Sequence, residues 1–383
     1  MQMTLIRTAS AVVALLVLLL DSGTAKAYPQ FQFSTDTKRC DLCHYSPAGG
    51  GLIKSYGRDA AGEEISMAGN GDFLHGAWTP PDWLDLGMDY RGATIIKDDE
   101  LTGSRTAIFP MQFDLYTRAK LADRVSFNMI AGFRGQARTT DNDSVIKRLV
   151  SREHFVMWKP RGKSKAYLRV GRFFAPYGLR LPDHTSYIRR YLGFHSLEET
   201  YNISYGSVKG DREYHMTAFA PTPDFLGSGT KAFGYAGYYE KRIRDGTAAW
   251  GAQVKVAVSP DDVSYMAGGV GKMWLAKAKL LLLGELNAGF QTFDADGADG
   301  RPQLAGYLGL TYFPMKGLML GTAVERYTSD LSIKGTERDS VNLSVQLFPY
   351  AHIELMLIGK FEFQGSKFGD AAKLGMFQFH YYL

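Results

Sequence analysis

The sequence has few cysteines, no long apolar stretch beyond its N-terminus and no strong excess of charge. Only 2 of its 383 residues are Cys, so at most one disulfide bond can form, which excludes a disulfide-stapled scaffold. Past the first 25 residues no run reaches the roughly 18 apolar residues that a spanning helix needs, which excludes a polytopic helical membrane protein. The formal net charge is +5 without a local Lys/Arg cluster, so nucleic acid is not an expected partner.

Short enzyme motifs are missing as well. The sequence contains no nucleotide-binding glycine fingerprint, no H-E-x-x-H zinc motif and no nucleophile elbow. Aromatic residues nevertheless make up 13% of the chain, which a disordered chain would lack. The chain is therefore expected to fold, and it carries no recognisable hydrolytic or nucleotide-dependent catalytic site.

Residues 1–27 have the composition of a secretory signal peptide. Arg7 supplies the positive charge, Ala11–Leu20 is an apolar stretch too short to span a bilayer, and Ala25-Lys26-Ala27 has the small-x-small pattern of a cleavage site. The alternative is an uncleaved membrane anchor. The mature protein is expected to begin at Tyr28 and to lie outside the cytoplasm.

Both cysteines lie in one pentapeptide, Cys40-Asp41-Leu42-Cys43-His44. This is the C-x-x-C-H pattern of c-type haem attachment, in which two thiols bond the vinyl groups of one haem and the adjacent His ligates iron. A thioredoxin-like pair would need a βαβ context, and a zinc site would need two further ligands. We therefore expect one covalent haem c on Cys40 and Cys43, with His44 as an axial iron ligand. A redox-switched disulfide gate without haem is a further alternative.

The second axial ligand is not fixed by the motif. Met and His are common distal ligands, and both types follow within about thirty residues, at Met67 and His75. His75 is the first choice because Phe73, Leu74 and Trp78 around it could pack on a haem face, and Met67 is the second. A five-coordinate iron, or a ligand from elsewhere in the chain, also remains open.

The stretch from residue 28 to residue 80 is interpreted as a monohaem cytochrome segment. It is short, rich in Gly and poor in apolar residues, so it cannot bury a haem by itself. We expect it to lean on another surface of the protein.

Residues 81–383 show a different pattern, with apolar and polar residues alternating at period two. In Ser340–Phe348, for example, Val, Leu, Val and Leu alternate with Ser, Asn, Ser and Gln. A soluble β-sandwich also alternates, but these segments are about ten residues long and carry aromatic residues near their ends, as membrane-spanning strands do. The fold class expected is all-β, a transmembrane antiparallel β-barrel.

About sixteen such segments can be counted. The connections alternate between short and long, as the periplasmic turns and external loops of outer-membrane barrels do. An even strand number places both termini in the periplasm, and the lumen of such a barrel is wide enough to hold a plug. The segments begin near Trp83, Ile108, Val125, Leu149, Ala166, Tyr201, Tyr214, Phe233, Ala248, Tyr265, Lys279, Leu304, Leu318, Ser340, His352 and Gly375.

The longest connection, Phe173–Thr200, is the third external loop. Its length suggests a function, because structureless links of this size are uncommon. Arg180, Arg189 and Arg190 could line a constriction there and favour anions or haem propionates. Alternatively, the loop stays outside and its arginines meet lipopolysaccharide phosphates.

One haem motif placed directly before a porin-sized barrel resembles the fused monohaem cytochrome–porins of the bacterial outer membrane, known from iron-oxidising bacteria. The residues that carry the resemblance are Cys40, Cys43 and His44, followed by Tyr56-Gly57-Arg58, which is similar to the aromatic-Gly-Arg that follows the haem motif in that family.

The resemblance implies an electron conduit in the outer membrane. Electrons would pass between an extracellular donor or acceptor, Fe²⁺ among them, and a periplasmic electron-carrier cytochrome. The implied activity is electron transfer, with Fe(II) oxidation as its possible enzymatic form. The haem segment would lie on the periplasmic side or in the lumen. The alternative function is a diffusion porin for small anionic solutes, with a haem-bearing periplasmic plug or redox sensor.

Overall fold

The computed structural model describes ten stretches of the chain, and the predicted signal peptide lies outside them. Among the described residues, no helix has both the length and the apolar character needed to cross a membrane. The described stretches are 31–34, 39–98, 103–134, 148–160, 165–183, 185–195, 198–222, 231–293, 300–365 and 371–383.

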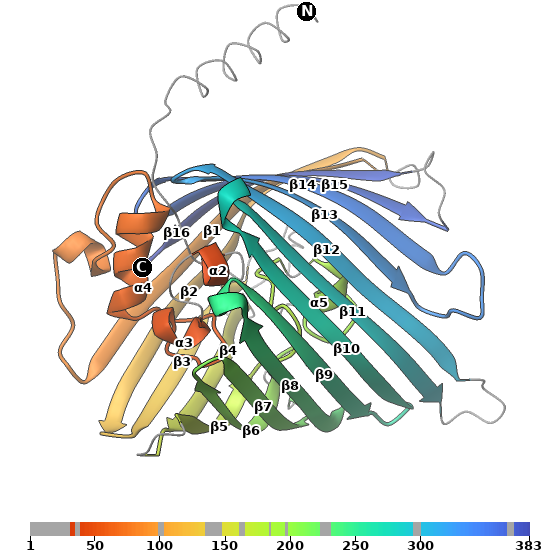
Figure 1. Ribbon diagram of the computed structural model, residues 1–383, viewed down its shortest axis with the longest axis horizontal. Helices are drawn as coiled ribbons and strands as arrows, with labels where there is room; N and C mark the ends of the chain where they lie inside the picture. Colours follow the sequence, from red (N-terminus) through yellow and green to blue (C-terminus); the bar gives the residue numbers. More distant parts are fainter. Residues whose placement is uncertain are drawn as a thin grey trace, which may run out of the picture.

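Sixteen antiparallel strands form one closed barrel, in which each strand pairs with its sequence neighbours and β1 pairs with β16 (Figure 1). The all-β, sixteen-stranded fold predicted from the alternation is therefore confirmed. The strands are β1 (Leu84–Asp98), β2 (Arg105–Ala122), β3 (Val125–Arg134), β4 (Leu149–Trp158), β5 (Ala166–Phe173), β6 (Thr200–Lys209), β7 (Arg212–Ala220), β8 (Phe233–Ile243), β9 (Ala248–Val258), β10 (Asp262–Leu275), β11 (Leu280–Phe293), β12 (Arg301–Met315), β13 (Leu318–Thr328), β14 (Glu337–Tyr350), β15 (Ile353–Gln364) and β16 (Ala372–Tyr382).

The alternation of each strand separates a lumen face from an outer face. On β11, Leu283, Glu285 and Asn287 are buried inside, whereas Leu286 and Phe290 between and beyond them are exposed. Exposed apolar residues recur on the outer face of other strands, at Ile203, Val254, Leu308, Leu343 and Leu357 among others. So much exposed apolar surface would be unfavourable in water, and a closed barrel is one of the two structures that can satisfy its backbone in lipid. The outer face is therefore a lipid-facing surface.

The N-terminal segment begins inside the barrel. It contains α2 (Phe31–Ser34), α3 (Cys40–Cys43), α4 (Ser55–Ala60), the π-helical turn η1 (Ala61–Ile65) and the 3₁₀ turn η2 (Phe73–Gly76). Figure 1 shows α2 and α3 within the ring of strands and α4 near its edge. This segment therefore gains from the barrel wall the supporting surface that its composition lacks.

Polar and aromatic contacts both hold α2 in the lumen. Gln32 donates from Nε2 to Glu240 on β8 (3.2 Å) and accepts at Oε1 from the Lys272 ammonium on β10 (3.0 Å). Lys272 and Glu240 also form a buried ion pair at 2.7 Å. Phe31 packs edge-on against Phe313 and Phe348, with ring centroids 6.0 Å apart in both pairs.

The rest of the segment is attached to the barrel end that carries the short turns. The Met67 amide donates to the Phe348 carbonyl (2.9 Å), and the Ala351 amide donates to the Ala68 carbonyl (2.8 Å). The Tyr45 hydroxyl also donates to Asp85 of β1 (2.7 Å). The described residues between 31 and 80 are called the plug below. The plug enters the barrel from the end that the alternation of loop lengths assigns to the periplasm.

The third external loop folds inward. Its backbone amides at Gly178 and Leu179 donate to Gln253 on β9 (3.1 Å) and Glu285 on β11 (2.7 Å). Further along, the short helix α5 (Tyr187–Arg190) begins where the Ser186 hydroxyl donates to Glu325 on β13 (2.8 Å). The loop therefore crosses the lumen and shares one apolar core with the plug, formed by residues such as Phe31, Ile65, Leu179, Ile188 and Phe348.

Candidate functional site

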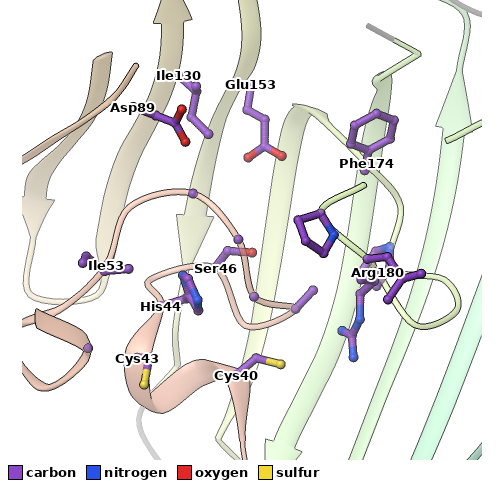
Figure 2. Close-up of a pocket in the computed structure, with 18 of the residues that line it drawn as sticks. Cys40, Cys43, His44, Ser46, Ile53, Asp89, Ile130, Glu153, Phe174 and Arg180 are labelled. Carbon is purple, nitrogen blue, oxygen red and sulfur yellow. The ribbon is translucent and has the colours of Figure 1, made fainter. Parts of the chain in front are cut away.

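The C-x-x-C-H pentapeptide forms one helical turn inside the barrel. Helix α3 runs from Cys40 to Cys43, and the His44 amide caps it by donating to the Cys40 carbonyl (3.0 Å). An Arg39–Asp41 ion pair at 2.9 Å supports the same turn from its outer side. Figure 2 shows this turn beside strands of the barrel wall, with Arg180 of the third loop nearby. Both thiols are free.

The turn borders a cavity of about 450 Å³ between the plug, the barrel wall and the third loop. This volume lies within the range of small-molecule and cofactor sites. The plug contributes Cys40, Cys43, His44, Ser46 and Gly49–Gly51, and the third loop contributes residues 174–177, 179–182, 188–189 and 194. The wall contributes Asp89, Arg91, Asp114, Ile130, Arg152, Glu153, Arg169, Glu285 and His380, among others.

The surroundings of the pentapeptide keep its two thiols and its imidazole uncharged at neutral pH. Burial raises the pKa of the Cys40 thiol, and burial together with the neighbouring Cys40 raises the pKa of the Cys43 thiol to about 11. Burial also lowers the pKa of the His44 imidazole to about 4, so His44 is neutral at neutral pH, the form that binds metals. Its Nδ1 is buried and has no hydrogen-bond partner among the described residues.

The alternative of a zinc site finds no support in the described part of the chain. No group of three or more His, Cys, Asp or Glu side chains converges there to hold a metal ion. Cys40, Cys43 and His44 have the residue types and spacing that would hold a haem by two thioether bonds, with His44 as its axial ligand. Such a group would supply a one-electron Fe(III)/Fe(II) couple.

Gly57 allows α4 to pack directly against the C-x-x-C-H turn. A Cβ atom at this position would lie 2.7 Å from the Cys43 carbonyl oxygen and 3.1 Å from the Cys43 Cβ. The first contact is with backbone, which cannot move without displacing the turn. This close approach gives a structural reason for Gly in the Tyr56-Gly57-Arg58 motif.

Gly57→Ala is expected to reduce the fraction of protein that carries covalent haem, although Ala favours helices. Overpacking of this kind costs about 1–3 kcal/mol. The fraction is measured by haem staining after denaturing electrophoresis, together with the rate of limited proteolysis in residues 39–66. Gly271→Ala on β10 is the control, because its Cβ would meet no atom within 4 Å. Equal haem fractions in both variants would contradict the packing role.

The two candidate distal ligands lie away from this cavity. The His75 ring is at the short-turn rim, 4.8 Å from the His352 ring and 5.5 Å from the Tyr350 ring, and Met67 lies close to Gly317 in the same region. Neither borders the cavity that contains His44. The structure thus does not bring Met67 or His75 together with the pentapeptide.

His380 does border the cavity, but its two ring nitrogens are already engaged. Nδ1 lies 2.6 Å from Glu354, and Nε2 lies 3.1 Å from Asp89. This imidazole is therefore fixed between two carboxylates, and the second axial ligand stays open.

The three loop arginines have different environments. Arg180 borders the cavity and pairs with Glu213 on β7 at 2.8 Å. Arg189 also borders it and is held by the backbone carbonyls of Leu181 and Phe194. Arg190 is exposed and lies over the Tyr191 ring.

Arg169 on β5 is a cavity residue that the sequence analysis did not select. Its guanidinium donates from Nη1 to the Ser46 hydroxyl of the plug (3.2 Å). The period-two pattern of β5 could have placed it on the lumen side, but no sequence signal links it to residue 46. Its contact with the plug arises only when the plug is inside the barrel.

Comparison with known proteins supports the fold. No family model matches the sequence, and no curated protein matches it either. Among solved structures, the chain resembles OprB of Pseudomonas putida, with a TM-score of 0.61, 12% identity and coverage of 78% of this chain and 94% of that one. It also resembles an anion-selective porin from Comamonas acidovorans, with a TM-score of 0.60, 10% identity and coverage of 78% and 99%.

A third similar structure is OmpT, an outer-membrane protein of Vibrio cholerae, with a TM-score of 0.59, 11% identity and coverage of 80% and 99%. The shared feature is the sixteen-stranded barrel of the porin type. A porin-type barrel with an apolar, lipid-facing exterior is an outer-membrane fold, which confirms the predicted localisation.

Proposed function

We propose that this protein is an outer-membrane cytochrome–porin that moves electrons through a single covalent haem c. The observation that carries the proposal is the position of the C-x-x-C-H turn inside the lumen, bordering a cavity enclosed by the plug, the wall and the third loop. Cys40 and Cys43 would hold the haem and His44 would ligate its iron. The barrel would carry this group into the membrane, where a soluble cytochrome cannot go.

The occupied lumen favours electron transfer over free diffusion of solutes. Phe31 and Gln32 of the plug are buried; Gln32 binds side chains of β8 and β10, and Phe31 packs on rings of β12 and β14. The third loop crosses the same lumen. An electron needs only closely spaced redox groups, whereas a solute needs continuous open space. The protein chain can therefore fill the lumen without blocking this function.

The proposed electron partners lie on opposite sides of the membrane. On the periplasmic side, the exposed aromatic side chains of Trp78 and Trp83 at the short-turn rim offer a surface for an electron-carrier cytochrome. On the extracellular side, the family resemblance points to Fe²⁺ as an electron donor. The direction of electron flow then depends on the potential of the haem relative to these partners.

The proposal is tested on protein purified in detergent from outer membranes of cells that mature c-type cytochromes. We expect haem that survives denaturing electrophoresis and a c-type visible spectrum. Adding Fe²⁺ to the oxidised protein is expected to produce the reduced spectrum. A c-type spectrum without response to Fe²⁺ would contradict the iron donor alone, and the absence of covalent haem would overturn the cytochrome assignment.

A second candidate function is diffusion of small anionic solutes through the barrel. The cationic side chains of Arg180 and Arg189 at the cavity favour it, as does the similarity of the fold to an anion-selective porin. In this case the haem segment would act as a plug or redox sensor. Conductance measurements separate the two functions.

A further inference from the structure

Arg169 is a buried cation without a carboxylate partner in the described part of the chain. The residue is 2% exposed, and its one hydrogen bond among the described residues is the 3.2 Å contact to Ser46. Its Nε has no hydrogen-bond partner among the described residues. The guanidinium carbon lies 3.6 Å from the centre of the Phe173 ring and 5.0 Å from that of Phe155, which hold the group in place and cannot neutralise it.

Other arginines of the same cavity are neutralised. Arg91 pairs with Asp89 at 3.0 Å, and Arg152 pairs with Asp114 at 2.7 Å. Glu153 borders the cavity too and interacts electrostatically with Arg169, but the two form no ion pair within 4.0 Å among the described contacts. Arg189 is instead held by the backbone carbonyls of Leu181 and Phe194, so Arg169 differs from these described cavity arginines in having neither an ion pair within 4.0 Å nor backbone acceptors.

Arg180 of the third loop presents a second unused donor to this cavity. One arm of its guanidinium, Nη2, binds Glu213, whereas Nη1 is buried without a partner among the described residues. Its guanidinium carbon lies 4.8 Å from the centre of the Tyr238 ring. Figure 2 shows the Arg180 side chain extending toward the turn that carries Cys40.

Burying a guanidinium without a counter-charge is unfavourable, and removing the cost requires an anion. The forked donors of Arg suit carboxylates in particular. Haem carries two propionate carboxylates, which would enter this cavity with the group attached to Cys40 and Cys43. These carboxylates are the kind of anion that the unused donors of Arg169 and Arg180 can bind.

We propose that Arg169 and Arg180 form a carboxylate-binding site for the two propionates of the attached haem. This inference rests on the proposed function. It makes both arginines positioning residues that also tune the reduction potential, because a cation beside a propionate favours the reduced, less positive iron. It also explains why the plug contacts β5 through Ser46, whose hydroxyl orients the guanidinium.

The test compares Arg169→Gln, Arg180→Gln and Arg169→Lys with the matched control Arg190→Gln, which removes an exposed arginine of the same loop. Midpoint potentials are measured by spectroelectrochemistry on the haem-loaded protein, and propionate bending modes by resonance Raman. We expect each Gln variant to lower the midpoint potential by ~59 mV, which for a one-electron couple is a tenfold change in the oxidised-to-reduced ratio. Arg169→Lys should recover part of the shift, and Arg190→Gln should match the wild type.

Each result has a definite meaning. Unchanged potentials and Raman modes in both Gln variants, with covalent haem present, would overturn this inference and leave the cytochrome intact. A wild-type protein without covalent haem would overturn both. A wild-type potential that shifts on adding succinate, with the shift lost in Arg169→Gln, would show that the arginines hold a free carboxylate instead of the propionates.

Discussion

A variant in which Cys40 and Cys43 are both replaced by Ser is expected to lose all covalent haem while its barrel still assembles. The two thiols are the described residues that can form thioether bonds, whereas the barrel closes through main-chain pairing of β1 with β16. Haem staining after denaturing electrophoresis reads the first property. The mobility difference between unheated and heated samples reads the second.

The matched control for this variant is Leu42→Ile, which lies between the cysteines and keeps the spacing of the motif. It should retain the c-type spectrum. Haem that stays on the double Ser variant through denaturation would show that other residues attach it.

His44→Ala is expected to keep the barrel and lose electron transfer by more than about a hundredfold, because axial ligation sets the redox properties of the iron.

The second large effect concerns ionic current. The complete protein in a planar bilayer is expected to show little or no open-channel conductance, because the plug and the third loop both occupy the lumen. A variant that lacks residues 28–80 should conduct several-fold more, since sixteen-stranded barrels otherwise enclose an aqueous channel. Single-channel recording measures both.

A finer variant tests whether the α2 anchor closes the channel. Gln32→Ala removes the side chain that bridges Glu240 and Lys272, and we expect transient openings. Gln303→Ala is the control, because its described contact is with Gln291 in the barrel wall. A large, steady current in the complete protein would instead support the diffusion porin.

Much of the barrel could be predicted because its information is local. Alternation at period two depends only on neighbouring residues, so β9 and β13 begin at Ala248 and Leu318, as predicted. Other strands extend further than predicted: β10 begins at Asp262 instead of Tyr265, and β14 at Glu337 instead of Ser340. Apart from Val263 these extra residues are polar, and the apolar pattern does not mark strand residues beyond the lipid.

The site was predictable only where it is contiguous. The pentapeptide around Cys40 and Cys43 is a local motif, so its chemistry could be proposed from five residues. The inward course of the third loop depends on Glu285 and Glu325, which lie about one hundred or more residues away in sequence. The Arg169–Ser46 contact spans a similar separation, 123 residues. Neither the contacts of the loop with the wall nor the Arg169–Ser46 contact can be predicted from a single sequence.

Main-chain amides, together with side chains such as Tyr177, hold the third loop in the lumen. The amides of Gly178, Leu179 and Tyr187 donate to Gln253, Glu285 and Glu325 on the wall. At Gly178 the backbone has φ +63°, and an added Cβ would collide with the Glu285 carboxylate, so this one position is restricted.

Main-chain donors are present whatever the side chains are. Natural variation, or a designer, can therefore exchange a cavity-facing residue of this loop outside the buried core, such as Pro182, and leave the path of the loop across the barrel unchanged. The path of the loop and the side chains that it presents to the cavity can therefore change independently. Loop substitutions alone could then adapt one barrel to different ligands.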